Sequence, residues 1–302
     1  MTEMKSNPFI AYGATLGAIV LWGLSYIWMN QLIGLGIPVE YFVFVRVVIG
    51  IVFLLCFNLI CGYSLKLHKK DLGTFLLLAL WEPLVYFICE TYGVKLTESP
   101  TYSALIISMT PVLAFVAGVV FFKEKITRLN VLGIIICLAG LTLVTWVSST
   151  VGREFVWGVV LLLVAVVAEV GLASFTKVLS SGYKASVIVM YQFMIGTVLL
   201  LPLFLTRGLE GFDPSLYFSW AVVRPILCLA LLCTAMAFTL WAVSVKHLGV
   251  AKAAVFQAMI PVVTALASFI LGQEYLTGIQ WVGIAIACCG VVLTQLAGVK
   301  RA

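Results

Sequence analysis

The sequence predicts an all-α integral membrane protein with ten transmembrane helices, built as two inverted five-helix repeats. Three observations lead to this prediction: an apolar composition, ten apolar runs of membrane-spanning length, and an internal repeat at an offset of 150 residues. Of the 302 residues, 63% are hydrophobic and 10% are charged. Soluble domains carry about 25% charged residues. So few polar residues could not cover the surface of a soluble protein, and lipid is therefore expected to surround most of this chain.

The ten apolar runs are joined by short connectors that leave no room for a soluble domain. A membrane-spanning helix needs about 20 predominantly apolar residues. Runs of that length centre on 10–33, 41–60, 72–94, 101–122, 129–147, 155–178, 186–206, 219–245, 251–271 and 279–298. The first run is too long for the apolar part of a signal peptide, so we expect it to remain as the first membrane helix.

Lysine and arginine are distributed unevenly between the connectors. If the N-terminus is cytoplasmic, thirteen of them fall on the cytoplasmic side, and only Lys95, Arg153 and Arg207 fall in outer connectors. Cytoplasmic connectors of membrane proteins carry an excess of these residues. The sequence therefore predicts a multi-pass protein of the cell (inner) membrane with both termini in the cytoplasm.

Several classes of function are excluded at this stage. The net charge of +6 is spread over the connectors without a basic stripe, so no nucleic-acid partner is expected. The eight cysteines form no CxxC or Cys/His pattern, which argues against a disulfide framework, a metal site or a cofactor. The two histidines, His68 and His247, lie at span ends, and no HExxH, GxGD or Ser/His arrangement is present, so an enzyme is not expected.

Two stretches of the chain overlay when it is shifted by 150 residues, one beginning at Ala104 and the other at Ala254. The matching pairs include Met109/Met259, Pro111/Pro261, Ala117/Ala267, Glu124/Glu274, Thr127/Thr277, Gly133/Gly283 and Gly140/Gly290. Five spans separate the copies, and an odd number reverses the orientation of the second. Residues 1–150 and 151–302 are therefore predicted to be inverted repeats, which are typical of transporters with a substrate site near the middle of the membrane.

The repeated prolines, Pro111 and Pro261, fall in the middle of their spans. Each removes one helix hydrogen bond and frees the carbonyl four residues earlier, at Ile107 and Gln257. Kinked, partly polar helix centres suit the wall of a cavity. A kink that serves helix packing alone is the alternative interpretation.

The repeated glycines and glutamates favour structural roles. The glycines form the pairs Gly133/Gly140 and Gly283/Gly290, seven residues apart, so each pair lies on one helix face and permits close helix contact. Glu124 and Glu274 follow the proline-bearing spans at opposite membrane surfaces. We expect them to close the connection to the next helix.

These residues together resemble the ten-helix, EamA-type members of the drug/metabolite transporter superfamily. The motifs of the first copy are Trp22-Gly23, Arg46, Pro111, Glu124, Gly133 and Gly140. The second copy keeps Pro261, Glu274, Gly283 and Gly290. It departs from the pattern with Ala168-Glu169 in place of Trp-Gly and with Gln192 in place of the arginine.

The resemblance covers essentially the whole chain, and its strength lies in the order, spacing and duplication of the motifs. It implies a central cavity lined by the first, third and fourth helices of each half. It also implies alternating access without ATP, often in the direction of export. It leaves the substrate open.

Two carboxylates, Glu82 and Glu90, interrupt the third apolar run. Tyr86 lies four residues from each of them, so the three are expected to share one broad helix face. An ionised carboxylate facing lipid costs several kcal/mol. That face is therefore expected to point into the helix bundle.

Two interpretations of these carboxylates remain open. In the first, Glu90 forms a structural ion pair with Arg46, and Glu82 is protonated or bonded to a neighbouring helix end. In the second, one carboxylate binds a proton or a cationic group of the substrate. Glu82 lies far from any cation evident in the sequence and is the preferred proton carrier, whereas Glu90 is expected to remain charged.

Further candidates lie on other spans. Glu169, near the middle of the sixth span, is a second candidate for proton coupling. Aromatic faces next to carboxylates suit a cationic or amphipathic ligand, although each aromatic alone is more often a packing residue. The predicted substrate-binding residues are Trp22, Tyr26, Tyr86, Glu90, Trp241 and Gln257.

The function predicted from the sequence is secondary active transport of a small organic metabolite, such as an amino acid or an amine, with proton-coupled export by alternating access. The expected partners are that substrate, protons and the lipid bilayer, with a homodimer left open. A passive channel or facilitator is the main alternative. It is less favoured because channels usually need a repeated filter or an oligomeric pore, and neither is apparent here. An enzyme embedded in the membrane is the weaker alternative.

Overall fold

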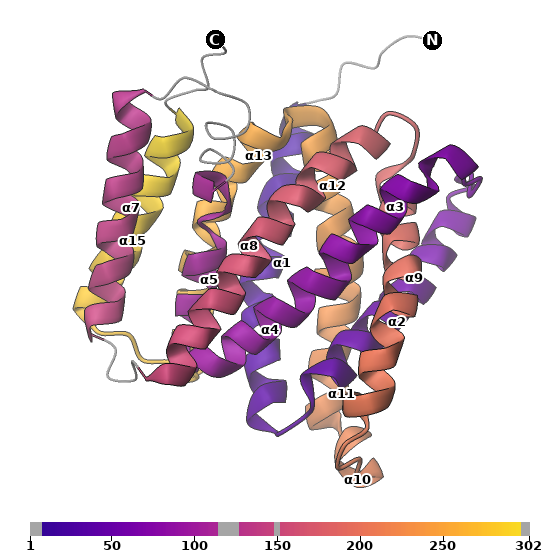
Figure 1. Cartoon of the computed structure of the whole chain (residues 1–302), viewed down its shortest axis with the longest axis horizontal. Coiled ribbons are helices and arrows are strands. Elements are labelled where there is room, and N and C mark those ends of the chain that lie inside the picture. Colours follow the sequence, from indigo (N-terminus) through magenta and orange to yellow (C-terminus); the bar gives the residue numbers. More distant parts are fainter. Residues whose placement is uncertain (1–7, 114–126, 148–151, 297–302) are drawn as a thin grey trace.

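The computed structural model describes residues 8–113, 127–147 and 152–296, and within these ranges every regular element is a helix (Figure 1). The elements of the first half are α1 (Pro8–Gly34), α2 (Val39–Ile60), η1 (Lys69–Asp71), α3 (Leu72–Ala79), η2 (Leu80–Val85), α4 (Tyr86–Thr97), α5 (Pro100–Ile107) and α7 (Arg128–Val147). Those of the second half are α8 (Arg153–Leu179), α9 (Ala185–Leu203), η3 (Phe204–Gly208), α10 (Pro214–Tyr217), α11 (Trp220–Leu227), η4 (Cys228–Ala237), α12 (Phe238–Leu248), α13 (Val250–Val255), η5 (Phe256–Met259), α14 (Ile260–Ile270) and α15 (Gly278–Leu296). The all-helical class predicted from the sequence is confirmed for these ranges.

Seven helical stretches in the described ranges are long and apolar enough to cross a membrane. Three shorter apolar helices, Pro100–Leu113, Arg128–Val144 and Gly278–Thr294, begin within one residue of the three remaining runs of the sequence. The structure thus agrees with a multi-pass membrane protein. The number of ten spans and the inverted relation of the halves remain predictions.

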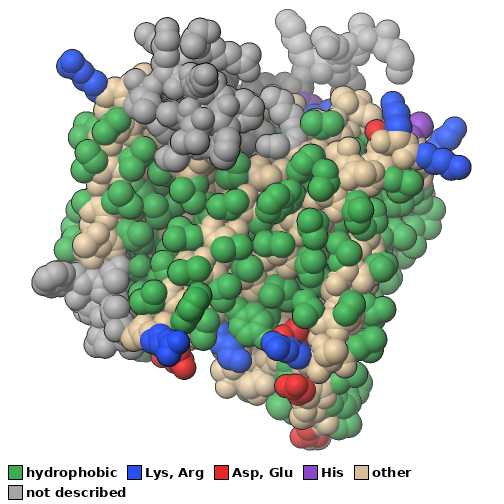
Figure 2. Space-filling view, viewed as in Figure 1, with side chains coloured by type: hydrophobic (Ala, Val, Ile, Leu, Met, Phe, Trp, Pro, Cys, Tyr) green, Lys and Arg blue, Asp and Glu red, His purple; other side chains and the backbone are tan. Residues whose placement is uncertain are grey.

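The surface is apolar around its middle. Figure 2 shows hydrophobic side chains covering the centre of the face that it draws, with lysine, arginine, aspartate and glutamate at the upper and lower margins. Large side chains such as Val198, Leu205 and Ile270 are more than half exposed. A soluble protein rarely exposes so continuous an apolar surface, and contact with lipid accounts for it.

The third predicted span is not one continuous helix, which corrects the sequence analysis. Between α3 and α4 the chain passes through η2, a π-helical segment in which Glu82 has an extended backbone (φ −149°, ψ 127°). Pro83 follows directly, and proline disfavours the helical conformation of the residue before it. Glu82 therefore lies at a helix break, and the expected shared helix face begins only at Tyr86.

Interruptions also lie just before the two repeated prolines. In the first half the helix stops at Ile107 and resumes at Thr110. In the second half the 3₁₀ segment η5 separates α13 from α14, and Pro261 lies in the first turn of α14. The predicted kinks are therefore short breaks that precede the prolines.

The carbonyl groups at these breaks find local donors. The Thr110 hydroxyl lies 2.7 Å from the Ile107 carbonyl oxygen, and the Ile260 backbone N–H donates to the Gln257 carbonyl. Buried backbone groups need such partners because no water reaches them.

The helices α7 and α15 pack against each other through their glycine faces, at the left of Figure 1. A Cβ atom on Gly140 would lie 2.4 Å from the Ala287 nitrogen, and one on Gly290 would lie 2.3 Å from the Cys137 nitrogen. These are contacts to backbone atoms, which cannot rotate away. The close helix contact predicted from the glycine spacing is confirmed.

We expect Gly290→Ala to lower the melting temperature of the purified protein, because the added methyl group must push α7 and α15 apart. Overpacking of this kind typically costs about 1–3 kcal/mol of unfolding free energy. The matched control is Gly278→Ala on the same helix, where an added Cβ meets nothing within 4 Å. Equal melting temperatures for the two variants would contradict the expected packing.

Candidate functional site

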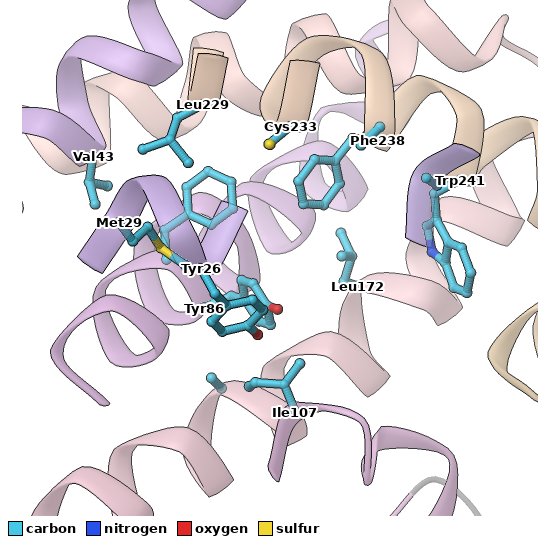
Figure 3. Packing of buried hydrophobic residues seen from close by; sticks show 14 of the residues in the cluster. Tyr26, Met29, Val43, Tyr86, Ile107, Leu172, Leu229, Cys233, Phe238 and Trp241 are labelled. Carbon is cyan, nitrogen blue, oxygen red and sulfur yellow. The ribbon is translucent and has the colours of Figure 1, made fainter. Parts of the chain in front are cut away.

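A buried cavity lies at the centre of the bundle, between the two halves of the chain. Its walls come from α1, α2, the broken third span, α5, α8, η4, α12 and the start of α14. The lining residues are Trp22, Ser25, Tyr26, Arg46, Glu82, Tyr86, Phe87, Glu90, Ile107, Glu169, Leu172, Cys233, Thr234, Phe238 and Ile260. Figure 3 shows Tyr26 and Tyr86 lying side by side, with Ile107, Leu172 and Phe238 around the same space.

The cavity is narrow in this conformation. The space open to the centre of a water molecule is about 20 Å³. This is room for about one water molecule, not for an organic ligand. Any larger ligand therefore requires the walls to move apart.

Glu90 is held by two tyrosines. Its Oε1 atom accepts hydrogen bonds from the Tyr26 hydroxyl at 2.9 Å and from the Tyr86 hydroxyl at 3.1 Å. Two donors on a single oxygen suit an ionised carboxylate, which only accepts. That Glu90 remains charged stays a prediction.

Arg46 lies in the same cavity without a direct carboxylate partner. Its guanidinium carbon lies 3.7 Å from the centre of the Phe87 ring, a cation–π contact. In the described part of the chain, no Arg46 nitrogen lies within 4.0 Å of a carboxylate oxygen. The ion pair that the sequence suggested between Arg46 and Glu90 is therefore not formed as a contact, and the two charges face the cavity separately.

One edge of the Arg46 guanidinium makes no hydrogen bond to the described residues. Its Nε and Nη2 atoms are buried and have no hydrogen-bond partner among the described residues, and the same holds for Trp22 Nε1 and Thr234 Oγ1. Thr234 packs against Gly50, one turn along α2 from Arg46. Buried donors without partners are rare because each costs about 1–3 kcal/mol. This side of the cavity is therefore suited to an acceptor group that enters it.

Glu82 interacts with the other half of the chain at the helix break. The Gln192 side-chain nitrogen donates to Glu82 Oε2 at 3.0 Å and to the Glu82 carbonyl oxygen at 3.1 Å. The other carboxyl oxygen, Oε1, is buried without a partner among the described residues. No described cation contacts Glu82 within 4.0 Å, which agrees with its separation from cations in the sequence.

Glu169 is bonded at the two proline-associated breaks. Its Oε2 atom lies 2.6 Å from the Thr110 hydroxyl, and its Oε1 atom accepts from the Gln257 side chain. Thr110 has a single hydroxyl proton and also lies close to the Ile107 carbonyl. If that proton goes to the carbonyl, the proton between Thr110 and Glu169 must belong to Glu169. The site can thus accommodate both the neutral and the ionised carboxyl group.

The cavity holds three carboxylates and one guanidinium. If all were ionised, two negative charges would remain uncompensated in an apolar surrounding, which is strongly unfavourable. Protons, or a cationic group on a ligand, would offset this charge.

Comparison with known proteins assigns the family. The model of the EamA-like transporter family matches residues 9–146 and again residues 156–296. The chain belongs to the EamA-like transporter family. It is therefore a transporter and not an enzyme, as the sequence predicted.

Several relatives of this EamA-like chain carry transporter names. "Uncharacterized transporter YetK" of Bacillus subtilis (strain 168) is 27% identical over 293 residues, which cover 95% of this chain and 87% of that protein. A "Probable terminal-alkyne amino-acid exporter" of Streptantibioticus cattleyicolor is 29% identical over 192 residues, 63% of this chain and 62% of that protein. A crystal structure of a protein with 17% identity superposes with a TM-score of 0.70 over 95% of this chain and 96% of that one, which shows a shared fold.

Most of the site residues that the sequence predicted for this EamA-like protein come together. Trp22, Tyr26, Tyr86 and Glu90 line the cavity, as do Arg46, Glu82 and Glu169. The other two lie one layer further out. Trp241 packs on Trp22 with ring centres 5.2 Å apart, and Gln257 contacts Glu169.

Sequence reasoning missed other residues of the site. Thr110 precedes Pro111 directly, and Gln192 takes the place of the arginine in the second repeat, so both had a signal in the sequence. Pro83, next to Glu82, was the missed sign of the helix break. Cys233 and Thr234 carried no such signal, because a small side chain in an apolar run is compatible with packing.

Glu274 joins the two halves of the EamA-like bundle at the predicted outer surface, which corrects its expected role. Its carboxylate accepts from the Ser99 hydroxyl, from the Thr101 backbone N–H at 3.2 Å and from the Thr101 hydroxyl at 2.5 Å. It thus caps the start of α5 in the first half and does not close the connection to α15. We call this contact the outer latch. Glu124, its repeat partner, lies outside the described residues.

We expect Glu274→Gln to loosen the outer latch and open the cavity more often to the outside. The amide retains one acceptor oxygen but loses the charge and the second acceptor. Hydrogen bonds to charged groups contribute about 1.5–3 kcal/mol, so the open population should rise about tenfold. The measurement is the labelling rate of Cys233 by a membrane-impermeant maleimide in a variant without the other cysteines.

The control for the outer latch is Glu98→Gln. Glu98 is exposed and lies next to Ser99, so its replacement by glutamine removes the same charge from the same surface. Equal labelling rates for Glu274→Gln and Glu98→Gln would show that the latch does not hold the outer side closed.

Proposed function

We propose that this chain is a secondary active transporter that exports a small zwitterionic metabolite of the amino-acid class in exchange for protons. The observation that carries this proposal is the composition of the cavity. A guanidinium edge on Arg46 without a partner among the described residues and a separate carboxylate, Glu90, face one cavity in a protein of a transporter family.

The two charged groups suit the two ends of an amino acid. Arginine binds a carboxylate through two parallel hydrogen bonds, and Nε with Nη2 forms one edge suited to this geometry. Trp22 Nε1 and Thr234 Oγ1 provide further donors on the cavity wall. Glu90, fixed by Tyr26 and Tyr86, offers an anionic partner for an ammonium group. The aromatic residues around them would contact the side chain of the substrate.

The direction of transport and the substrate class have support from one relative. The protein of Streptantibioticus cattleyicolor is named as a probable exporter of an amino acid. Alternating access is compatible with the narrow cavity, because the walls of such a carrier move apart and together during each transport cycle.

Proton coupling rests on Glu82 and Glu169. Both are buried, and neither has a cationic partner within 4.0 Å among the described residues. Each is hydrogen-bonded to a side chain of another segment. A change in its charge would therefore change the hydrogen bonds at a helix break. Protons bound here on one side of the membrane could be released on the other.

The proposed topology has both termini in the cytoplasm and the two five-helix halves in opposite orientations. The family model matches the chain twice, which supports the division into two related halves. Cysteines introduced at Arg153 and at Lys184 should be labelled from opposite sides of the inner membrane. Labelling of both from one side would rule out this topology.

Homodimer formation is a separate proposal, tested by the mass of the solubilised particle.

The test of function is counterflow in proteoliposomes that contain the purified protein. We expect unlabelled amino acid inside the vesicles to drive uptake of labelled amino acid. Analogues that lack either the carboxylate or the ammonium group should compete about 100-fold less well, because each leaves a buried charged partner unpaired. Equal competition by a decarboxylated analogue would contradict the role of Arg46.

A passive facilitator is the second candidate. It would show the same saturable exchange but no accumulation against a concentration gradient. An imposed pH gradient that drives uphill movement of substrate distinguishes the coupled carrier from the facilitator.

A further inference from the structure

A second pocket, remote from the central cavity, lies at the predicted cytoplasmic surface. It is formed by the connector between α2 and η1, the connector between α8 and α9, and the end of α12. Its space for water-molecule centres is about 620 Å³, which falls in the range of ligand-binding pockets. The lining residues are Gly62, Tyr63, Ser64, Lys66, His68, Ser181, Gly182, Tyr183, Lys184 and Lys246. We call it the basic pocket.

The charge of the basic pocket has one sign. Lys66, Lys184 and Lys246 approach it from three separate segments, and none of its described lining residues is acidic. Among the described residues, none of these lysines has a carboxylate within 4.0 Å. Lys184 instead lies over the Tyr63 ring, 5.4 Å from its centre. Cytoplasmic connectors are basic in general, but here the charges converge on one concave space.

The wall of the basic pocket is ordered by contacts between the two halves. The Tyr183 hydroxyl accepts from the His68 backbone N–H at 3.1 Å and donates to Asp71 Oδ2 at 2.7 Å. The Tyr191 hydroxyl donates to the Leu65 carbonyl. Asp71, the nearby carboxylate, is not among the lining residues; its Oδ2 accepts from Tyr183 and lies 4.0 Å from His68 Nδ1. The connector is thus held in place before any ligand binds, which lowers the entropic cost of binding.

Lipid-facing side chains border the basic pocket. Ile60, two residues before Gly62, is 86% exposed, and Val178, three residues before Ser181, is 63% exposed. Figure 2 shows lysine or arginine, histidine and acidic side chains at the upper right corner, directly above the hydrophobic band. A ligand there would meet cations at one end and the acyl region of the membrane at the other.

We propose that the basic pocket binds the phosphate of an anionic glycerophospholipid, whose acyl chains lie along the ends of α2 and α8. Clustered basic residues at the cytoplasmic face attract anionic head groups, and pockets between helices can hold them specifically. Because the pocket is built from both halves of the chain, the bound lipid links them at this surface. The proposal is independent of the transported substrate.

The test uses the full-length protein in a neutral detergent, titrated with phosphatidylglycerol while its melting temperature is recorded. We expect stabilisation by phosphatidylglycerol and none by phosphatidylcholine. In the variant Lys66→Gln/Lys184→Gln/Lys246→Gln, the half-saturating lipid concentration should rise about tenfold or more. The control, Lys69→Gln/Lys70→Gln/Arg128→Gln, removes the same charge outside the pocket lining and should change it less than about twofold.

Three outcomes would overturn the proposal: unchanged lipid binding by the pocket variant, an equal loss in the control, or equal stabilisation by phosphatidylcholine. Glycerol 3-phosphate serves as the soluble arm. If it stabilises the protein as well as the lipid does, the lipid is not the ligand and a soluble phosphate ester takes its place. Should the triple variant not fold, Lys246→Gln alone is titrated, and an unchanged half-saturating concentration counts against the pocket.

Discussion

Glu82→Gln is expected to abolish transport that is driven by a pH gradient while leaving exchange of substrate for substrate intact. Glutamine can accept from Gln192 in the same way as the carboxyl group, so the helix break should keep its structure. It cannot bind or release a proton. Both activities are measured in the same proteoliposomes, with and without an imposed gradient, and gradient-driven accumulation should fall to the level seen without a gradient.

The controls for Glu82 separate coupling from folding. Glu98→Gln, at an exposed site, should leave both activities unchanged. Glu169→Gln in the same assay tests the second candidate, which is bonded to Thr110 and Gln257. If Glu82→Gln still accumulates substrate when a gradient is imposed, Glu82 is not the proton carrier, and Glu169 and Glu90 are left to account for coupling.

Arg46→Lys is expected to weaken substrate binding about 100-fold, although it keeps the positive charge, because lysine cannot offer two parallel donors to one carboxylate. The Phe87 ring would also lose its planar cationic partner. The measurement is the substrate concentration for half-maximal counterflow, together with the thermal stabilisation of the purified variant by substrate.

Arg224→Lys is the matched control, since Arg224 is exposed at the end of α11. It should bind substrate as the unmodified protein does. Unchanged half-saturation in Arg46→Lys would mean that the guanidinium edge does not hold the substrate. A lower melting temperature without any change in half-saturation would assign Arg46 to folding alone.

Much of the fold could be predicted because lipid imposes simple rules on a sequence. The helical class follows from apolar runs that must satisfy their own backbone groups, and the observed helices coincide with those runs. The close contact of α7 and α15 followed from glycines at a seven-residue spacing. The backbone departs from a helix at Glu82, and the one sign of this break in the sequence is the next residue, Pro83.

The candidate site was predictable in its charged members and less so elsewhere. A carboxylate or guanidinium inside an apolar run has to face the bundle interior, which brought Arg46, Glu82, Glu90 and Glu169 to one cavity. The distances between them depend on helix rotation and depth. A sequence gives helix rotation and depth only to within a turn. It therefore could not show that Arg46 and Glu90 do not contact each other. Neutral residues such as Thr234 have no comparable signal.

The outer latch has a further consequence when the two ends of the protein are compared. Ser99 and Thr101 supply the hydroxyl donors at the predicted outer end, whereas the repeat positions at the predicted cytoplasmic end are Gly249 and Ala251, which have no hydroxyl group. The hydroxyl donors of the outer latch therefore have no counterpart at the two repeat positions. We expect the outer entrance to open less readily than the inner one. Such a bias would leave the site accessible to a cytoplasmic solute once the carrier has released its protons there, which is the step that exchange of substrate for protons requires.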